Sequence, residues 1–273
     1  MPVFDKYLNE ILPDNYNGYF EKLTIHPDWL LSNYIDNYSI LSNKKITDTS
    51  NWLILPDTSS YLLCFRFAGL KNQWKHLFVG PRTKSVEIIQ AGREITIVIK
   101  FKPGGAYPFF NTSLNEFTDT TVDLSLISKH KNDLLTEGLG KNQNNYARVL
   151  DDFLWSQFKQ SQSVNSSVIA LNTVIESSKG IISVKDLSGK IGLSERHILN
   201  ILKTHTGLST KKMLSITRLL NSLGFVDNAA YNVSWSSMAY QSGYSDQAHL
   251  IDDYSEMLQM TPTVFIKRLN IQG

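Results

Sequence analysis

The sequence predicts an α+β protein of two domains. An N-terminal antiparallel β domain with trailing helices is followed by an all-α domain with two helix-turn-helix motifs joined by a bridging helix. Three observations predict this. Up to about residue 125, runs of apolar residues have the length and alternation of strands. From about residue 126 the apolar spacing is helical. One helical segment then occurs twice, about 50 residues apart.

The first part of the chain, residues 1–125, is the candidate sensor or regulatory domain. YLLCFRFAG (61–69) is a short apolar run that ends at a glycine, and SVEIIQAGREITIVIKF (85–101) holds two strand-like runs about a glycine-containing turn. KPGGAYP (102–108) ends the pattern, because neither Pro nor Gly continues a β-ladder well. In the run before it, alternate positions are apolar, as a half-buried strand requires. These positions are Ile95, Ile97, Ile99 and Phe101.

Residues 126–160 are predicted to be a helical segment. Its apolar residues follow the spacing i, i+3, i+4, i+7: Tyr146, Val149, Leu150, Phe153, Leu154 and Phe158. Such a stripe fits two roles, packing on the β domain or dimerisation, so a homodimer stays open. The polar, Ser-rich residues that follow have no periodicity. We therefore predict a linker at 161–167 and the all-α domain at 168–273.

The all-α part contains an internal repeat. LSGKIGLSERHILNILKTHTGLS (187–209) aligns with MAYQSGYSDQAHLIDDYSEMLQMT (238–261), which has one extra residue in its turn. Two copies are too few for a solenoid, whose stacked core normally needs three, so a duplicated small module is the better interpretation. Matching pairs are Leu187 and Met238, Gly192 and Gly243, Ile198 and Leu250, Leu202 and Tyr254, and Leu208 and Met260.

Each copy has the parts of a helix-turn-helix, predicted at about 184–205 and about 235–258. An apolar helix ends at a glycine, which adopts a left-handed backbone without strain. A short polar residue, Ser194 or Asp246, then accepts from the first N–H groups of the next helix.

Two further helices complete the domain. TKKMLSITRLLNSLGF (210–225) has one apolar face and is predicted to bridge the motifs over about 210–223, ending at Gly224. Thr261 followed by Pro262 is an N-cap with proline at the first helical position, which opens a last helix to about Leu269.

The duplicated module resembles the tandem helix-turn-helix domain of AraC/XylS-type bacterial transcription regulators. The second motif, SGYSDQAHL with the later MTP, carries the resemblance most specifically. In the β part LPD (55–57), FVGPRT (78–83) and FKPGGAYPFF (101–110) resemble the sensor domain of one branch of these regulators. The resemblance implies a sequence-specific DNA-binding regulator of transcription with double-stranded DNA as its partner. Activator and repressor stay open, and RNA polymerase is a further candidate partner, as it is for an acidic face that docks a protein.

The resemblance also implies that the second helix of each motif enters the major groove. The base-contacting candidates are Arg196, Leu199 and Asn200 in the first motif and Gln247 and His249 in the second. Arg pairs bidentately with guanine, and Asn or Gln with adenine. His249 fits capping or packing equally well. The candidate phosphate contacts are Lys203, Lys211 and Lys212.

Charge separates the two motifs. Net charge is only +2, but residues 196–226 hold five basic groups and no acid. The second helix of the second motif has Asp252 where these regulators commonly have Arg or Lys, and Gln259 replaces the usual glycine after it. An acid accepts from cytosine but does not neutralise phosphate. We therefore expect the first motif to bind DNA most strongly. The alternative is a regulatory protein-interaction module whose DNA binding is weak or lost.

Other functional classes find little support in the sequence. It has no GxSxG, P-loop or paired catalytic carboxylates, so we expect no enzyme and no cofactor. The single Cys64 and scattered histidines predict no metal site and fit a reducing cytoplasm. The N-terminus lacks the apolar core of a signal peptide, and no apolar run is long enough to span a membrane. Aromatic residues of the β part fit either its core or a pocket for a small-molecule effector: Tyr61, Phe65, Phe67, Trp74, Phe109 and Phe110.

Overall fold

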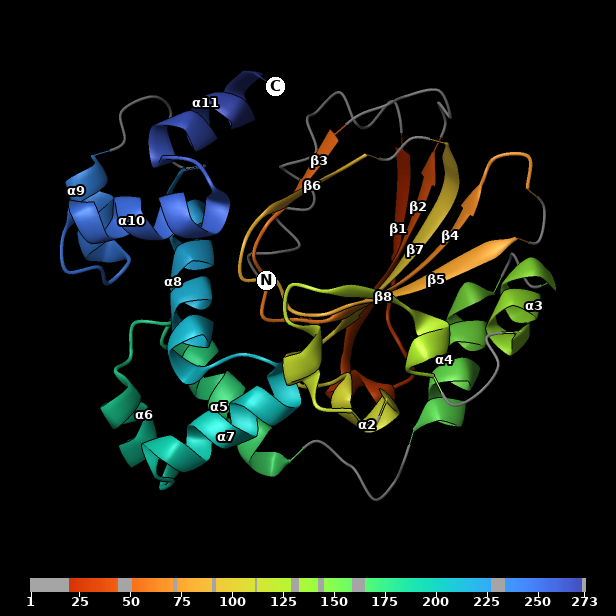
Figure 1. Cartoon of the computed structure of the whole chain (residues 1–273), viewed down its shortest axis with the longest axis horizontal. Helices are drawn as coiled ribbons and strands as arrows, with labels where there is room; N and C mark the ends of the chain where they lie inside the picture. Colours follow the sequence, from red (N-terminus) through yellow and green to blue (C-terminus); the bar gives the residue numbers. More distant parts are fainter. Residues whose placement is uncertain are drawn as a thin grey trace.

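The computed structural model describes most of the chain, namely residues 20–43, 51–70, 73–89, 92–110, 112–128, 133–141, 145–158, 165–226 and 234–271. Figure 1 shows a β domain beside a helical domain, which is the predicted α+β architecture. The first nineteen residues of the predicted β domain lie outside the described part.

The β domain is built on a six-stranded antiparallel sheet. The strand order is β1 (Phe20–Ile25), β2 (Ile35–Asn43), β7 (Arg93–Phe101), β4 (Tyr61–Phe67), β5 (Trp74–Val79) and β8 (Thr121–Asp123). Strand β7 lies in the middle, where Ile97 faces Ile40 of β2 and Cys64 of β4. All four apolar residues predicted on its inner face are buried.

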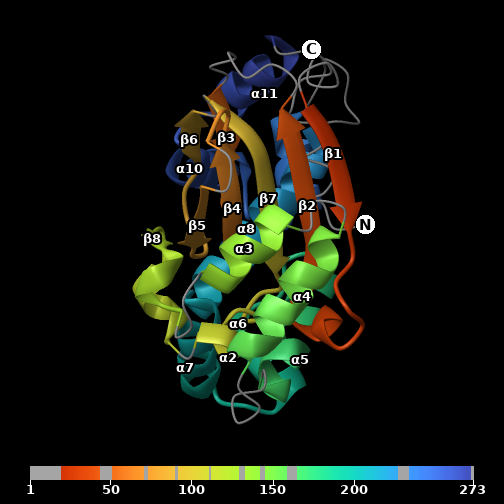
Figure 2. The ribbon, with the colours of Figure 1, turned by 90° about the vertical axis from the view of Figure 1, so that its right-hand side faces the viewer.

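A second, two-stranded sheet pairs β3 (Asn51–Ile54) with β6 (Val86–Ile89). The two strand-like runs of 85–101 thus form β6 and β7, which belong to different sheets. The β3–β6 sheet lies on the side of the β domain that faces the helical domain (Figure 1), and it overlaps α10 in the perpendicular view of Figure 2. This position brings the β3–β6 sheet into contact with the helical domain.

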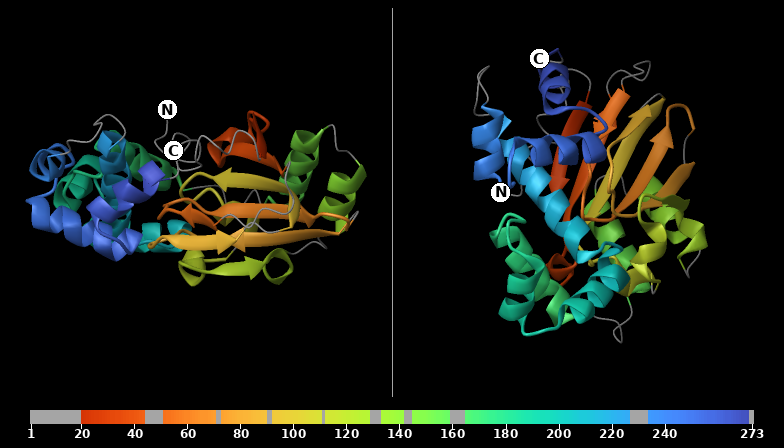
Figure 3. Two further views of the ribbon diagram at one scale, coloured as in Figure 1. Left: turned by 90° about the horizontal axis from the view of Figure 1, so that it is seen from above. Right: turned by 60° about the vertical axis from the view of Figure 1, so that its left-hand side comes forward.

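Short helices close the β domain. They are η2 (Leu31–Asn33), α2 (Tyr107–Phe110), η3 (Leu114–Phe117) and η4 (Leu124–Leu126), followed by α3 (Asp133–Lys141) and α4 (Tyr146–Gln157). Helices α3 and α4 pack at the end of the sheet away from the helical domain (Figure 3). The α4 stripe packs into the core of the β domain, where Leu150, Phe153 and Leu154 are buried. Core packing, the first of the two roles predicted for the stripe, is therefore the one seen within this chain.

The helical domain contains seven helices among the described residues. They are α5 (Ser166–Ser177), α6 (Val184–Ile191), α7 (Glu195–Thr206), α8 (Thr210–Val226), α9 (Trp235–Gln241), α10 (Gln247–Leu258) and α11 (Pro262–Ile271). Their apolar faces enclose one core, to which both motifs and the bridging helix α8 contribute.

Two predicted boundaries in this domain differ from the structure. Helix α5 begins at Ser166, inside the predicted linker, because Asn165 caps it by accepting from the Ser167 N–H at 2.9 Å. Helix α8 continues through Gly224 to Val226. A glycine inside a helix costs only about 1 kcal/mol, which the fully buried Leu223 and the partly buried Phe225 offset.

Candidate nucleic-acid interface

The first helix-turn-helix is formed by α6 and α7. Gly192 ends α6 with a left-handed backbone (φ 74°), and its N–H donates to the Ser188 carbonyl at 2.9 Å. The Ser194 hydroxyl then accepts from the His197 N–H at 3.3 Å and caps α7, as the sequence predicted. Inside the turn, Ser188 donates to the Leu193 carbonyl at 2.6 Å. These bonds fix the angle at which α7 leaves the turn.

Helix α7 buries one face and exposes the other. Ile198 and Leu202 are buried in the helical core. Arg196 and Asn200 lie four residues apart on the exposed face, Leu199 is half-buried between them, and Lys203 continues the exposed side. Among the described residues, none makes a hydrogen bond or ion pair with the side chains of Arg196, Asn200 or Lys203. This face has the residue types and the free donors of a groove-binding surface.

The second motif, α9 and α10, has the same geometry, but its exposed residues make hydrogen bonds and ring contacts within the motif. Asp246 caps α10 by accepting from the His249 N–H at 2.9 Å. Ser236 of α9 donates to the Gln247 side-chain oxygen at 3.0 Å. The half-buried His249 ring lies 3.2 Å from the Ser245 hydroxyl and packs edge-on against Tyr244, with ring centres 5.2 Å apart. The His249 ring therefore packs within the motif, and its contact with a base stays a prediction.

Most of the negative charge on α10 is compensated inside the domain. Asp253 lies 3.5 Å from the Arg218 guanidinium of α8, and both side chains are largely buried. Glu256 accepts from Lys212 of α8 at 2.6 Å, and this bond lowers the pKa of the Glu256 carboxyl. Asp246 is the cap. Among the described residues, only Asp252 of the four acids is left exposed on α10 without a partner.

This compensation changes what the lysines of α8 offer to DNA. Lys212, a predicted phosphate contact, is half-buried and paired with Glu256. Its neighbour Lys211 is exposed, with no ion pair in the described part of the chain. The sequence did not reveal the Arg218 site, where the guanidinium lies 4.6 Å from the centre of the Tyr244 ring as well as beside Asp253. Its residues come from three elements, so no local spacing signals it.

Comparison with known proteins identifies the domain. Residues 187–268 match a family model described as a helix-turn-helix domain. They form an AraC-type helix-turn-helix domain. A domain of this type supports a DNA-binding regulator as the functional class of the chain. Residues 23–123 match a second family model, described as a domain of unknown function (DUF6597). No curated protein matches the chain.

Solved structures of ToxT from Vibrio cholerae are similar to the chain along most of its length. The O395 structure is 8% identical with a TM-score of 0.41, and the alignment covers 92% of this chain and 98% of that one. The P21 crystal form gives 9%, 0.42 and the same coverage. ToxT of strain SCE256 with bound unsaturated fatty acid gives 12%, 0.36 and 91% of each chain. TM-scores below 0.5 do not establish a shared arrangement, so the assignment rests on the AraC-type domain.

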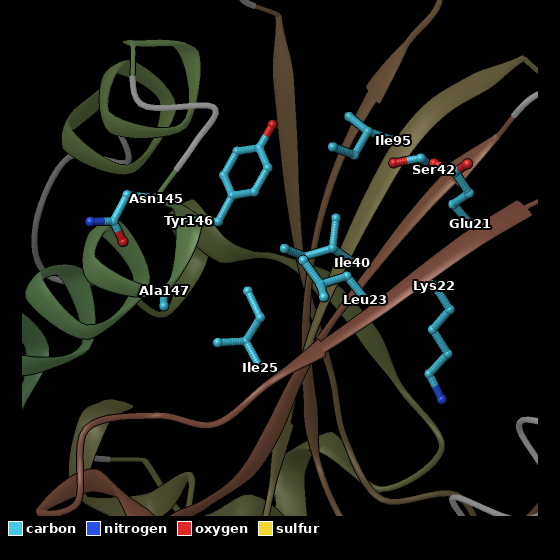
Figure 4. A pocket seen from close by; sticks show the side chains of 10 residues that line it. All are labelled: Glu21, Lys22, Leu23, Ile25, Ile40, Ser42, Ile95, Asn145, Tyr146 and Ala147. Atoms are coloured by element: carbon cyan, nitrogen blue, oxygen red, sulfur yellow. The ribbon is translucent and has the colours of Figure 1, made fainter.

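The β domain that accompanies the AraC-type domain has a hollow of about 770 Å³ between α4 and the sheet. Figure 4 shows the Tyr146 ring pointing from α4 toward the strands. Strands β1, β2 and β7 contribute both apolar and polar side chains to the lining, and the start of α4 contributes the rest: Glu21, Lys22, Leu23, Ile25, Ile40, Ser42, Ile95, Asn145, Tyr146 and Ala147. None of the six aromatic residues suggested for a pocket lines it. Five of the six are buried and Phe67 is half-buried, so they pack rather than open a cavity.

The described ranges contain neither a candidate metal site nor a candidate membrane span. No three His, Cys, Asp or Glu side chains come together there as metal ligands. None of the helices in those ranges has the length and apolar character needed to span a bilayer.

Proposed function

We propose that the chain regulates transcription by binding a specific DNA sequence in the cytoplasm, mainly through α7. One observation carries the proposal. Helix α7 exposes Arg196 and Asn200 without internal partners, whereas Asp252 is the exposed charge of α10 that lacks a partner among the described residues. Gln247 and His249 are hydrogen-bonded within the second motif. Lys203 and Lys211 supply phosphate contacts in this proposal, while Lys212 does so only if it leaves Glu256.

The β domain is proposed to carry the regulatory signal. The hollow beside α4 has the size and the mixed lining of a small-molecule site. Ligand-induced stabilisation tests this role: a small molecule bound there raises the melting temperature of the whole chain, and Ile40→Trp, which fills the hollow, should abolish the rise. A rise that survives Ile40→Trp would place the ligand elsewhere.

Binding of the full chain to unrelated duplex DNA should fall linearly with the logarithm of salt concentration, because bound phosphates release counterions. Asp252→Arg should tighten this binding and steepen the slope by about 0.9 for each additional phosphate that the variant neutralises. Fluorescence anisotropy over a salt series measures both quantities.

Asp152→Arg is the matched control, since it makes the same charge change on the exposed side of α4 in the β domain. If both variants tighten binding equally, net charge and not the position on α10 decides affinity. Salt-independent or absent binding would instead favour the second candidate function, a protein-interaction module, which the exposed acid on α10 supports.

A further inference from the structure

The C-terminal end of α10 is held by the β domain. Ser85, which directly precedes β6, is buried against it. The Ser85 N–H donates to the Met257 carbonyl at 2.7 Å, and its hydroxyl donates to the Leu258 carbonyl at 2.8 Å. In return, the Gln259 side-chain N–H donates to the Ser85 carbonyl at 2.7 Å. One residue of the β domain thus makes three hydrogen bonds to the end of α10, the second helix of the second motif, which we call the second recognition helix; α7 is the first.

Through these bonds the β domain provides hydrogen-bond donors for the last carbonyls of a helix in the helical domain. The last four carbonyls of an α-helix have no partner within the helix. At the end of α7 a hydrogen-bond donor comes from the next residue of the chain, because the Gly207 N–H donates back to the Lys203 carbonyl at 3.1 Å. At the end of α10, two terminal carbonyls accept from Ser85, which lies more than 170 residues earlier in the chain. The order of this end therefore depends on the β domain staying in place.

The backbone conformation of Gln259 also depends on the contact with the β domain. It has a left-handed conformation (φ 59°), as does Gly207 (φ 80°) at the equivalent position of the first motif. A side chain is strained there, and glycine is the usual solution. Strain of this kind persists where the surroundings hold it, and it points to a role for the side chain. Here the side chain makes the bond to Ser85, which glycine would not make.

The surrounding contacts are apolar and ionic. Leu55, which directly follows β3, is 3% exposed and belongs to the core of the helical domain, and Leu53 packs on the same core. Glu87 of β6 accepts from Arg268 of α11 at 2.7 Å. The β3–β6 sheet thus adds to the core of the neighbouring domain, and this contact positions Ser85.

The first recognition helix meets a different part of the β domain. The Thr118 hydroxyl donates to the Gly207 carbonyl at 2.7 Å, and the His205 ring packs on Tyr107 with centres 4.3 Å apart. Thr118 and Tyr107 belong to the α2–η3 region, whereas Ser85 directly precedes β6 of the β3–β6 sheet. Both recognition helices are therefore held at their C-terminal ends, each by its own segment.

We propose that Ser85 and Gln259 are positioning residues that fix α10 against the β domain, independently of the contact that fixes α7. Movement of the β3–β6 sheet releases the end of α10 and leaves α7 in place. The consequence for DNA rests on the proposed function: release frees the second motif while the first remains able to bind.

Hydrogen exchange of the full chain without DNA tests the proposal. Ser85→Ala removes the hydroxyl bond, and Gln259→Asn keeps a residue that tolerates the left-handed backbone but shortens its side chain by one methylene. In each variant the amides in the last two turns of α10 should exchange roughly two- to tenfold faster, the range expected for one lost hydrogen bond. Those of α7 should be unchanged.

Thr118→Val is the reciprocal control, which should speed exchange at the end of α7 and not in α10. Unchanged exchange in α10 for both variants would overturn the proposal. So would an equal acceleration of α7 and α10, which indicates one common opening. Because no DNA is present, failure here is distinct from failure of the proposed DNA binding, which the salt series measures.

Discussion

Leu55→Ala is expected to lower the free energy of unfolding of the helical domain by about 2–5 kcal/mol, the usual cost of removing a buried leucine side chain. The residue lies in the N-terminal half of the sequence. Its side chain is nevertheless 3% exposed within the core formed by α5 to α11. The loss should therefore appear in a domain that begins more than a hundred residues later.

Native-state hydrogen exchange measures this effect by segment, since protected amides of α8 report the opening of the helical core. Leu62→Ala is the matched control: Leu62 is fully buried in β4 and belongs to the core of the β domain. It should lower protection in β4 and β7 first. Full protection of α8 in Leu55→Ala would show that the β3–β6 sheet does not contribute to the helical core.

Gly207→Ala is expected to destabilise the chain by roughly 1–3 kcal/mol more than Gly192→Ala, through overpacking at a closed site. Both glycines have a left-handed backbone, so alanine costs about 1–2 kcal/mol at either position. They differ in their surroundings. A methyl group on Gly207 would lie 2.6 Å from the Leu114 carbonyl oxygen and 2.9 Å from the Thr118 hydroxyl, whereas Gly192 has nothing within 4 Å.

The difference between the two variants isolates the domain contact from the backbone strain. Denaturant unfolding of each variant gives the free energies, and hydrogen exchange at the end of α7 locates the effect. Equal losses would mean that the η3 segment gives way easily and does not hold α7.

Local features of the AraC-type domain could be predicted from sequence because each is decided within a few residues. Ser194 and Asp246 cap their helices, and Gly192 and Gly243 have the left-handed backbone expected of a helix end. The helical face that exposes Arg196 and Asn200 also follows from spacing alone. By contrast, the start of α5 depended on one Asn cap inside a Ser-rich stretch, whose composition suggested a linker.

Contacts between distant segments could not be predicted in this way. Glu256 and Lys212 are 44 residues apart, and their pairing depends on how α8 crosses α10. The sequence showed Gln259 as an unusual residue for its position. The bond to Ser85 that explains this residue forms only when the two domains pack together. The same limit applies to the acidic residues of α10, most of which proved to be structural.

Selection of bound duplexes from a random pool, followed by footprinting, tests most directly that this chain recognises DNA mainly through α7. We expect one enriched block of bases, which Arg196→Ala weakens by about 1–3 kcal/mol, the usual worth of one bidentate base contact. Two equally strong blocks about one helical turn apart, both insensitive to Arg196→Ala, would contradict the account. So would the absence of any enrichment.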